Sequence, residues 1–322
     1  MLKDLVNLKT RVFIDGKEGT TGLQIVERLE NRSDLEILTI DEEKRKDINE
    51  RKRLINQSDI TFLCLPDAAA REAVELAENE NVRIIDASTA HRTAAGWDYG
   101  FPELSCRHRE SIAHSKRVAN PGCYASGFIS LVYPLVKAGV LPEEYPLTCH
   151  AVSGYSGGGK KMITAMESDE KSREMYSPRQ YALGQTHKHL PEMQAVCGLK
   201  YPPMFNPIVD DYYSGMVVTV PLISRALSRR YTPEDIHDIL SAHYEGQRFV
   251  RVMELSGKET LSDGFLAANT LAGTNDMQLF VCGNEEQILL CSRFDNLGKG
   301  ASGAAVQNMN IMLGIDEDTG LC

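Results

Sequence analysis

Residues 10–22 read TRVFIDGKEGTTG, a short β-rich run followed by a turn that contains three spaced glycines. Residues 21–29 then continue with the apolar spacing of a helix, so this stretch predicts a strand, a tight turn and a helix. The same pattern repeats, with strands expected at residues 35–41, 59–65 and 82–86 and a helix at 68–80. Strands that alternate with helices form right-handed βαβ units, which predict a doubly wound parallel sheet.

The sequence changes character near residue 120. We expect a helix from Cys123 to Lys137 and a last helix over residues 299–313. Between them lie β-rich runs typical of a mainly antiparallel sheet, at residues 147–153, 215–222, 249–254, 279–283 and 288–293. The chain is therefore predicted to be α/β, with a Rossmann-type domain at residues 1–120, an α+β domain at 121–292 and a C-terminal helical segment at 293–322.

Composition is that of a globular protein. The 322 residues are 42% apolar and 25% charged, which suffices for two domain cores. A formal net charge of −10 argues against a nucleic-acid partner or an anionic membrane, because both attract clustered Lys and Arg. No apolar run approaches the roughly 18 residues of a membrane helix, and residues 1–13 lack the apolar core of a signal peptide. We expect a soluble, cytoplasmic protein.

The glycine turn has the chemistry of a dinucleotide-binding loop. Gly16, Gly19 and Gly22 are spaced G-x-x-G-x-x-G, which differs from the usual G-x-G-x-x-G, and they enclose Thr20 and Thr21. Glycines let the backbone turn tightly and approach a pyrophosphate, whose charge is stabilised by the N-terminus of the following helix. A purely structural turn is the alternative. The position after the first strand of a βαβ series favours the dinucleotide site.

The choice between NAD and NADP rests on residues after the second predicted strand. Asp41 ends that strand, where an acidic residue favours the ribose 2′-hydroxyl of NAD. Lys44, Arg45 and Lys46 follow at once and are suited to the 2′-phosphate of NADP. A solvated charged surface is the alternative reading of this run. Because of these three basic residues, NADP is the predicted dinucleotide.

The eight cysteines stand singly, and none forms a C-x-x-C pair, so the spacing indicates neither a disulfide framework nor a zinc ribbon. Cys123 is distinguished by its place in NPGCYA at residues 120–125, between a Pro-Gly turn and a predicted helix. The helix dipole is expected to lower the pKa of this thiol, and free backbone N–H groups to hold an oxyanion. A buried structural cysteine is the alternative, which we expect for the other seven. The Pro-Gly turn before Cys123 favours the interpretation of this cysteine as a nucleophile.

A second motif supplies a candidate base. Residues 187–192 read HKHLPE, which places His187 and His189 two residues apart with Glu192 close behind. H-x-H occurs in metal sites, but no third ligand stands at metal spacing, so we predict no metal. A cysteine nucleophile requires a base that exchanges protons near neutral pH, and a carboxylate that orients that base. The motif therefore predicts a base–orienter pair, although single histidines are more often structural.

Two further stretches suggest anion binding. Ser88 and Arg92 follow the fourth predicted strand, at the carboxyl edge where open α/β sheets bind ligands. Arg92 is suited to a carboxylate or a phosphate, with a surface arginine as the alternative. Residues 153–160 read SGYSGGGK, an N–H-rich loop that fits a phosphate cradle and a hairpin turn equally well.

Together these motifs resemble the N-acetyl-γ-glutamyl-phosphate reductases of arginine biosynthesis, in the shorter of that family's two forms, over nearly the whole chain. The NPGCYA stretch is similar to the family's nucleophile signature, the SGYSGGGK stretch to its S-G-x-S-G-x-G loop, and the HKHLPE stretch to its H-x-H-x-P-E motif. Residues 295–310, DNLGKGASGAAVQNMN, resemble the element that returns to the cofactor domain and helps seat the nicotinamide, also in the related aspartate-semialdehyde dehydrogenases.

The resemblance implies site residues and their roles. Cys123 is the implied acyl carrier, His187 the proton-transfer base, with which His189 could exchange roles, and Glu192 a supporting carboxylate. We assign the remaining positions in two groups. The cofactor group is Gly16, Gly19, Thr20, Thr21, Gly22, Ser88, Gly157, Gly158, Asn296 and Gly300. The substrate group is Arg92, Asn120, Ser153 and Lys160.

The implied reaction is the NADPH-dependent reduction of N-acetyl-γ-glutamyl phosphate to the semialdehyde and phosphate through a thioester on Cys123. The resemblance also implies a homodimer or homotetramer assembled through the sheet of the second domain. Two rivals stay open. One is another acyl-phosphate reductase, either aspartate-semialdehyde dehydrogenase or a lysine-pathway homologue, and the other is a non-catalytic dinucleotide sensor.

Overall fold

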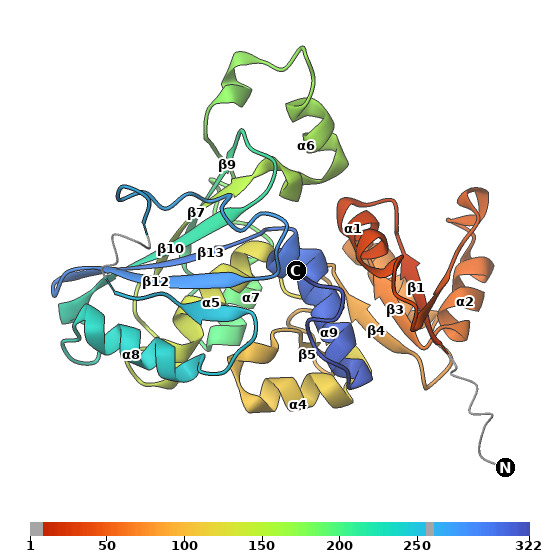
Figure 1. The fold of residues 1–322 in the computed structure, drawn as a ribbon, viewed down its shortest axis with the longest axis horizontal. Helices are drawn as coiled ribbons and strands as arrows, with labels where there is room; N and C mark the ends of the chain where they lie inside the picture. Colours follow the sequence, from red (N-terminus) through yellow and green to blue (C-terminus); the bar gives the residue numbers. More distant parts are fainter. Residues whose placement is uncertain (1–8, 256–260) are drawn as a thin grey trace.

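The computed structural model describes residues 9–255 and 261–322, and residues 1–8 of the N-terminal stretch lie outside the described residues, as do residues 256–260. Two β-sheets stand side by side, with the C-terminal helix α9 (Gly303–Leu313) between them (Figure 1). Within the described residues, no helix combines the length and the apolar character needed to cross a membrane.

The first sheet, sheet A, is wholly parallel in the order β2-β1-β3-β4-β6-β5, so the predicted doubly wound sheet is confirmed. Its elements in chain order are β1 (Thr10–Asp15), α1 (Thr20–Leu29), β2 (Leu35–Leu38), η1 (Glu42–Lys44), α2 (Ile48–Gln57), β3 (Ile60–Leu63), α3 (Asp67–Glu75), β4 (Arg83–Asp86), β5 (Asp98–Tyr99), η2 (Pro102–Leu104), α4 (Cys106–His114) and β6 (Arg117–Ala119).

Helices cover both faces of sheet A because its strands are apolar on both sides. Val12 and Ile14 of β1 pack in one core with residues of α1, α4 and α9. Phe13, which points to the opposite face, packs with residues of α2 and α3. Helix α2 was not predicted, since its sequence INERKRLINQ is dominated by polar residues. Its N-terminus is instead fixed by the Asp47 side chain, which accepts two backbone N–H groups.

The second sheet, sheet B, is mixed in the order β11-β12-β13-β10-β7-β9-β8. Antiparallel pairing joins β10 to β13 and to β7, β12 to β13, and β8 to β9. Parallel pairing joins β7 to β9 and β11 to β12. The prediction of a mainly antiparallel sheet is therefore confirmed. The elements of this part are α5 (Cys123–Lys137), β7 (Thr148–Gly154), η3 (Tyr155–Gly158), α6 (Gly159–Met166), η4 (Arg173–Tyr176), β8 (Arg179–Gln180), α7 (Leu190–Cys197), β9 (Met204–Asp210), β10 (Met216–Ile223), η5 (Ser224–Ala226), α8 (Pro233–His243), β11 (Val250–Val252), β12 (Met277–Gly283) and β13 (Gln287–Phe294).

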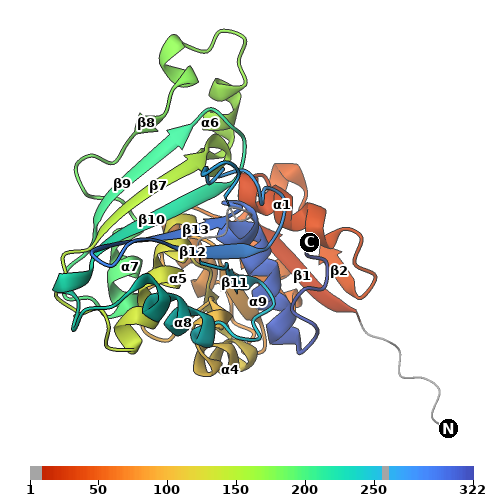
Figure 2. The ribbon, with the colours of Figure 1, turned by 60° about the vertical axis from the view of Figure 1, so that its left-hand side comes forward.

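One face of sheet B is packed against helices and the other is open. Helices α5, α7 and α8 cover the inner face, where the largest apolar core of the described chain lies (Figure 2). Strand β10 alternates between the two faces, and its outward residues end at Ile223, which is 43% exposed. Strand β9 was not predicted, because Pro207 in its middle argues against a central strand.

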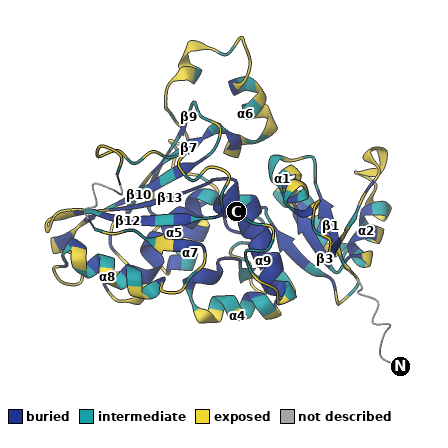
Figure 3. Ribbon diagram, in the orientation of Figure 1, coloured by how far each residue is buried: buried dark blue, intermediate teal, exposed yellow. Residues whose placement is uncertain are grey.

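The chain returns from sheet B to sheet A through an irregular helix. One helix was predicted over residues 299–313, but the structure opens with a π-helical turn, η6 (Gly298–Ser302), before α9. The turn places Lys299 inward, where its Nζ lies 2.7 Å from Oε1 of Glu103. Gln307 of α9 bonds to both side chains. Figure 3 shows α9 buried along its length, as a segment between two domains should be.

This buried ion pair yields a stability prediction. Lys299→Ala leaves the Glu103 carboxylate uncompensated in the interior, so we expect a loss of about 3–5 kcal/mol in the free energy of unfolding. The measurement is urea unfolding followed by fluorescence. Lys52→Ala is the matched control, because its ion pair with Glu78 is solvent-exposed and contributes at most about 1 kcal/mol. Equal effects of the two substitutions would contradict the assignment.

Candidate active site

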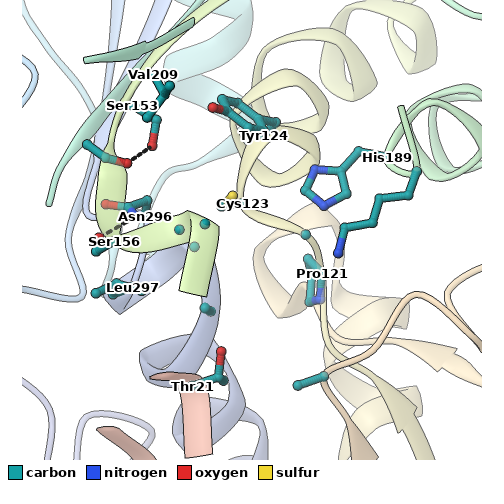
Figure 4. A pocket seen from close by; sticks show the side chains of 18 of the residues that line it. Thr21, Pro121, Cys123, Tyr124, Ser153, Ser156, His189, Val209, Asn296 and Leu297 are labelled. Atoms are coloured by element: carbon teal, nitrogen blue, oxygen red, sulfur yellow. Dashed lines mark hydrogen bonds between the residues drawn. The ribbon is translucent and has the colours of Figure 1, made fainter. Parts of the chain in front are cut away.

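A cavity of about 380 Å³ lies where the two domains and the C-terminal return meet (Figure 4). Its walls come from segments far apart in the sequence: the start of α1, the ends of β4 and β6, the start of α5, the loop after β7, the segment before α7, and the return after β13. The predicted site residues among its lining are Thr21, Arg92, Asn120, Cys123, Ser153, Gly157, Gly158, His187, His189, Asn296 and Gly300.

Cys123 is the first residue of α5, and its sulfur points into this cavity (Figure 4). The residue before it, Gly122, allows this arrangement. A Cβ at Gly122 would collide with Nη1 of Arg92, Nε2 of His189 and Oε1 of Glu192. On the other side, a Cβ at Gly300 would lie 2.9 Å from the Cβ of Cys123. A side chain at either position would therefore require its neighbours to shift, so the cysteine lies between two closely packed walls.

The expected lowering of the Cys123 pKa is wrong for this structure. Burial raises the pKa of the thiol to about 11. The backbone N–H of Tyr124 and the charge of Arg92 act in the predicted direction, but their effect is smaller than that of desolvation. The cysteine therefore rests as a neutral thiol at neutral pH, and a base is needed to activate it.

His187 and His189 both line the cavity, and their rings meet edge to face with centroids 4.7 Å apart. Nδ1 of His187 accepts the backbone N–H of His189 at 3.1 Å, so the proton of the neutral His187 ring sits on Nε2. Burial lowers the pKa of His187 to about 4. His189 is 5% exposed, and burial beside Arg92 holds its pKa well below the ordinary value.

Glu192 lies behind the cavity wall and does not line it. Its Oε1 accepts the backbone N–H of Gly122 at 3.0 Å and Nη1 of Arg92 at 3.2 Å. Burial raises the pKa of this carboxyl to about 7, although the guanidinium beside it opposes the shift. The geometry fits a carboxylate that fixes the turn before the nucleophile. No hydrogen bond joins Glu192 to either histidine ring among the described residues.

Several predicted ligand-binding side chains already bond to the framework. Arg92 donates to the carbonyls of Asn120 and Ala87 as well as to Glu192. Asn120 donates to the carbonyl of Ala301 at 2.9 Å, which ties the nucleophile turn to the C-terminal return. Asn296 bonds to Ser156 and to the backbone N–H of Gly215.

Seven predicted residues lie outside this cavity lining, namely Ser88, Lys160, Glu192, and Gly16, Gly19, Thr20 and Gly22 of the glycine loop. Ser88 is buried and its hydroxyl donates to Asp86 at 2.8 Å. Lys160 is exposed, and its nearest ionic partner is Glu18 in the glycine loop, at 3.7 Å. Position in a motif therefore did not determine whether a side chain reaches the cavity.

Sequence reasoning missed several side chains of the lining, among them Lys188, Tyr124 and Tyr181. Lys188 is a cation on the cavity wall that forms no hydrogen bond or ion pair with the described residues. Tyr124 and Tyr181 also line the cavity, and each packs against the His187 ring with centroids 5.8 Å apart. Lys188 lies inside HKHLPE, so its charge between two histidines was a signal that could have identified it.

The glycine loop separates this cavity from a second one. A cavity of about 310 Å³ is lined by Asp15, Gly16, Lys17, Glu18, Ile40, Glu42, Arg45, Lys46 and Leu65. Gly16 turns with a φ of +88°, and a Cβ there would collide with the carbonyl of Cys64. The second cavity and the glycine loop together therefore extend from the residues after β2 to Thr21, which lines the Cys123 cavity.

The residues at this loop fit a dinucleotide. Helix α1 begins without a side-chain cap, so its first backbone N–H groups are available to a pyrophosphate. The buried Oγ1 of Thr20 also lacks a hydrogen-bond partner among the described residues. Gly157 and Gly300 keep the wall beside Cys123 free of side chains. Within the described chain, no cluster of His, Cys, Asp and Glu is arranged to hold a metal.

Comparison with known proteins agrees with this arrangement. Residues 11–114 match the family model described as semialdehyde dehydrogenase, NAD binding domain, and residues 123–296 match semialdehyde dehydrogenase, dimerisation domain. The fold is similar to aspartate semialdehyde dehydrogenase II from Vibrio cholerae, with a TM-score of 0.70 and 15% identity over 95% of this chain and 98% of that one. It is likewise similar to aspartate semialdehyde dehydrogenase from Francisella tularensis, with a TM-score of 0.71 and 15% identity over 94% and 100%.

Sequence relatives are much closer. N-acetyl-gamma-glutamyl-phosphate reductase 2 of Nostoc sp. is 49% identical over 97% of this chain and 99% of its own length. N-acetyl-gamma-glutamyl-phosphate reductase 2 of Pseudomonas putida is 51% identical over 94% and 96%, and the Burkholderia ambifaria reductase is 50% identical over the same shares. This chain therefore belongs to the N-acetyl-gamma-glutamyl-phosphate reductases, within the semialdehyde dehydrogenase family.

Proposed function

We propose that the chain reduces N-acetyl-γ-glutamyl phosphate to N-acetylglutamate semialdehyde and phosphate through a thioester on Cys123, as a step of arginine biosynthesis. The observation that carries the proposal is the cavity in which Cys123, His187 and Lys188 converge beside a dinucleotide loop. Aspartate-semialdehyde dehydrogenases have the same fold, but their identity to this chain is 15%, against 49–51% for the acetylglutamyl reductases. The substrate assignment follows the closer relatives.

A bound nicotinamide dinucleotide supplies the hydride that reduces the thioester. The residues that would hold it are the glycine loop with Thr20 and Thr21 for the pyrophosphate, and Gly157 and Gly300 at the Cys123 end. We propose NADP as the dinucleotide. In support, Arg45 and Lys46 line the cavity beyond the glycine loop, whereas Asp41, the residue expected to favour NAD, is not part of that lining.

Proton transfer is assigned to the two side chains with opposite pKa shifts. His187 starts neutral and takes the Cys123 proton as the sulfur–carbon bond forms and the carbon–oxygen bond to phosphate breaks, and the departing phosphate takes up one proton from solvent. After reduction, His187 returns this proton to the oxyanion of the hemithioacetal. The carbonyl of the aldehyde then forms as the carbon–sulfur bond breaks, and the hydroxyl proton returns by way of His187 to the Cys123 sulfur.

His187 is favoured over His189 as the proton carrier by exposure. His189 is 5% exposed beside Arg92, so a proton on it would create a buried charge next to a cation. His187 is half-buried, and its Nε2 is left free by the hydrogen bond at Nδ1. His189 instead donates the backbone N–H that orients the His187 ring.

Lys188 is proposed to bind the phosphate of the substrate. Lys188 lines the same cavity as Cys123 and His187, and its charge acts on both groups and on Glu192. It forms no hydrogen bond or salt bridge with the described residues, although its charge also acts on Asp67, whereas the Arg92 guanidinium is shared between Glu192 and two carbonyls. A bound phosphate dianion also raises the pKa of His187, which helps it to take the thiol proton.

We propose that two copies of the chain join through the open face of sheet B to form a homodimer. Two such dimers would make up a homotetramer. In support, the dimerisation family model covers residues 123–296, and the face exposes apolar residues such as Ile223 and Leu289. A cytoplasmic location belongs to the same proposal, since all eight cysteines are free, as is usual in a reducing compartment.

The function is tested by trapping the acyl enzyme. Incubation with N-acetyl-γ-glutamyl phosphate in the absence of NADPH should add the N-acetylglutamyl group to Cys123, detected by peptide mass spectrometry. Cys123→Ser should show no such adduct and should lose at least about 10³-fold in kcat, because the hydroxyl is a far weaker nucleophile. Exposed Cys106→Ser is the control and should keep full activity. Unchanged turnover of Cys123→Ser would support the non-catalytic sensor instead.

The neutral resting thiol predicts a distinctive pH dependence of alkylation. Because burial raises the pKa of Cys123 to about 11, only about one molecule in a thousand carries the thiolate at pH 8. The rate of iodoacetamide labelling at Cys123 should therefore rise about tenfold for each unit between pH 7 and pH 10. Labelling is followed by mass spectrometry of the ligand-free enzyme. A plateau reached below pH 8 would show an activated thiolate and overturn the mechanism.

The cofactor preference is tested in the cavity beyond the glycine loop. Replacing both Arg45 and Lys46 by Ala should raise the KM for NADPH by about 10–100-fold and leave the KM for NADH unchanged, because only NADPH carries the 2′-phosphate. Lys44→Ala is the matched control, since Lys44 lies in the same basic run but outside the cavity lining. Equal rises for both dinucleotides would argue against NADP.

A further inference from the structure

The loop that carries His187 into the cavity has a strained backbone. Ala182 and Gln185 adopt left-handed conformations, with φ of 51° and 55°. Among the non-glycine residues that the structure describes, only Asp263 shares this property. Such a conformation is unfavourable for a residue with a Cβ, so a compensating contact must hold the loop in place.

The side-chain amide of Gln185 supplies that contact. Its Nε2 donates to the carbonyl of Phe205 at 2.8 Å, and its Oε1 accepts the backbone N–H of Phe205 at 2.8 Å. Strand β8 pairs with β9 at Ile208 and Val209, and the backbone N–H of Tyr181 then donates to the carbonyl of Pro207, so the backbone pairing ends before Phe205. The amide of Gln185 therefore takes the place of a neighbouring strand there, and it satisfies two backbone groups at once.

Phe205 is also one of the aromatic residues that pack against the His187 ring. The rings of His187 and Phe205 meet edge to face, with centroids 5.1 Å apart. Phe205 itself is 1% exposed and is fixed in sheet B by its pairing opposite Cys149. Gln185 and His187 are two residues apart, so the loop is held to Phe205 at the backbone and at the ring. A shift at one contact displaces the other, because two residues span at most about 7 Å.

We infer that Gln185 is a positioning residue of the reaction, which locks the strained 181–187 loop to Phe205 so that His187 faces Cys123. The inference rests on the proposed function, in which His187 transfers the proton. Gln185 is exposed to solvent outside the cavity lining, so it touches neither substrate nor dinucleotide. Its effect on catalysis acts through the placement of His187.

Steady-state kinetics of two variants test this assignment. Gln185→Ala removes both hydrogen bonds and should lower kcat by about 10–100-fold, as expected for a displacement of about 1 Å at a reacting group. The KM for NADPH should stay within twofold, because sheet A is untouched. Gln185→Glu has a side chain of the same length, but its ionised carboxylate cannot donate a hydrogen bond to the Phe205 carbonyl. The kcat of this variant relative to wild type should therefore recover at low pH, where the carboxyl is protonated and can donate again. Gln180→Ala, an exposed glutamine on the same edge, should match wild type.

A second readout is independent of substrate. Ring resonances of ¹³C-labelled histidine report the titration of His187, and assignment uses His187→Asn. Burial lowers the pKa of His187 to about 4 in the intact loop, and Gln185→Ala should move it upward by at least one pH unit as the ring becomes solvated. Gln180→Ala should leave it in place.

The outcomes separate the two proposals. A wild-type enzyme that does not turn over N-acetyl-γ-glutamyl phosphate overturns the proposed function, and the histidine titration then still tests the lock on the loop. If Gln185→Ala keeps both kcat within twofold and the His187 titration unchanged, Gln185 only covers a strand edge and the inference is wrong.

Discussion

The site depends on the close approach of three side chains to the backbone of Gly122. Arg92 comes from the loop after β4, and His189 and Glu192 come from the start of α7, so two domains meet at one residue that lacks a side chain. The backbone N–H of Gly122 is itself bonded to Glu192. A methyl group at this position would separate all three, and Cys123, the next residue, would lose its place at the cavity wall. The contacts that hold the turn before Cys123 in place are therefore also contacts between the two domains.

Burial at this junction sets the protonation states. Desolvation raises the pKa of Cys123 and lowers that of His187, so the resting pair is neutral. Neutral groups avoid the cost of buried charge between turnovers. An anionic substrate changes this balance, because negative charge near His187 favours the imidazolium. In the proposed mechanism, activation of Cys123 therefore waits until a phosphate is bound, and the thiol is protected from side reactions in the meantime.

A large part of the polar lining serves to hold the walls together. Asn120 and Asn296 each connect the C-terminal return to another wall of the cavity, and Arg92 connects the β4 loop to the nucleophile turn. The ion pair between Lys299 and Glu103 also holds this C-terminal return in place. Lys188, to which we assign the substrate phosphate, forms no hydrogen bond or salt bridge with the described residues. Rigid polar walls beside such a cation suit a site that must position a small anion.

The sequence by itself determined the local elements. The strand–glycine–helix order at residues 10–29 and the Pro-Gly turn before Cys123 predicted local elements, because both depend on neighbouring residues only, and the repeated alternation of strands and helices up to residue 86 predicted sheet A. Tertiary structure decided the rest. Sheet B acquires β9 despite Pro207, since its neighbours supply the pairing, and Lys160 pairs with Glu18 outside the cavity. The sign of the Cys123 pKa shift was also decided there. A helix dipole can be read from sequence, but the larger desolvation depends on how much protein packs around the sulfur, which no local pattern encodes.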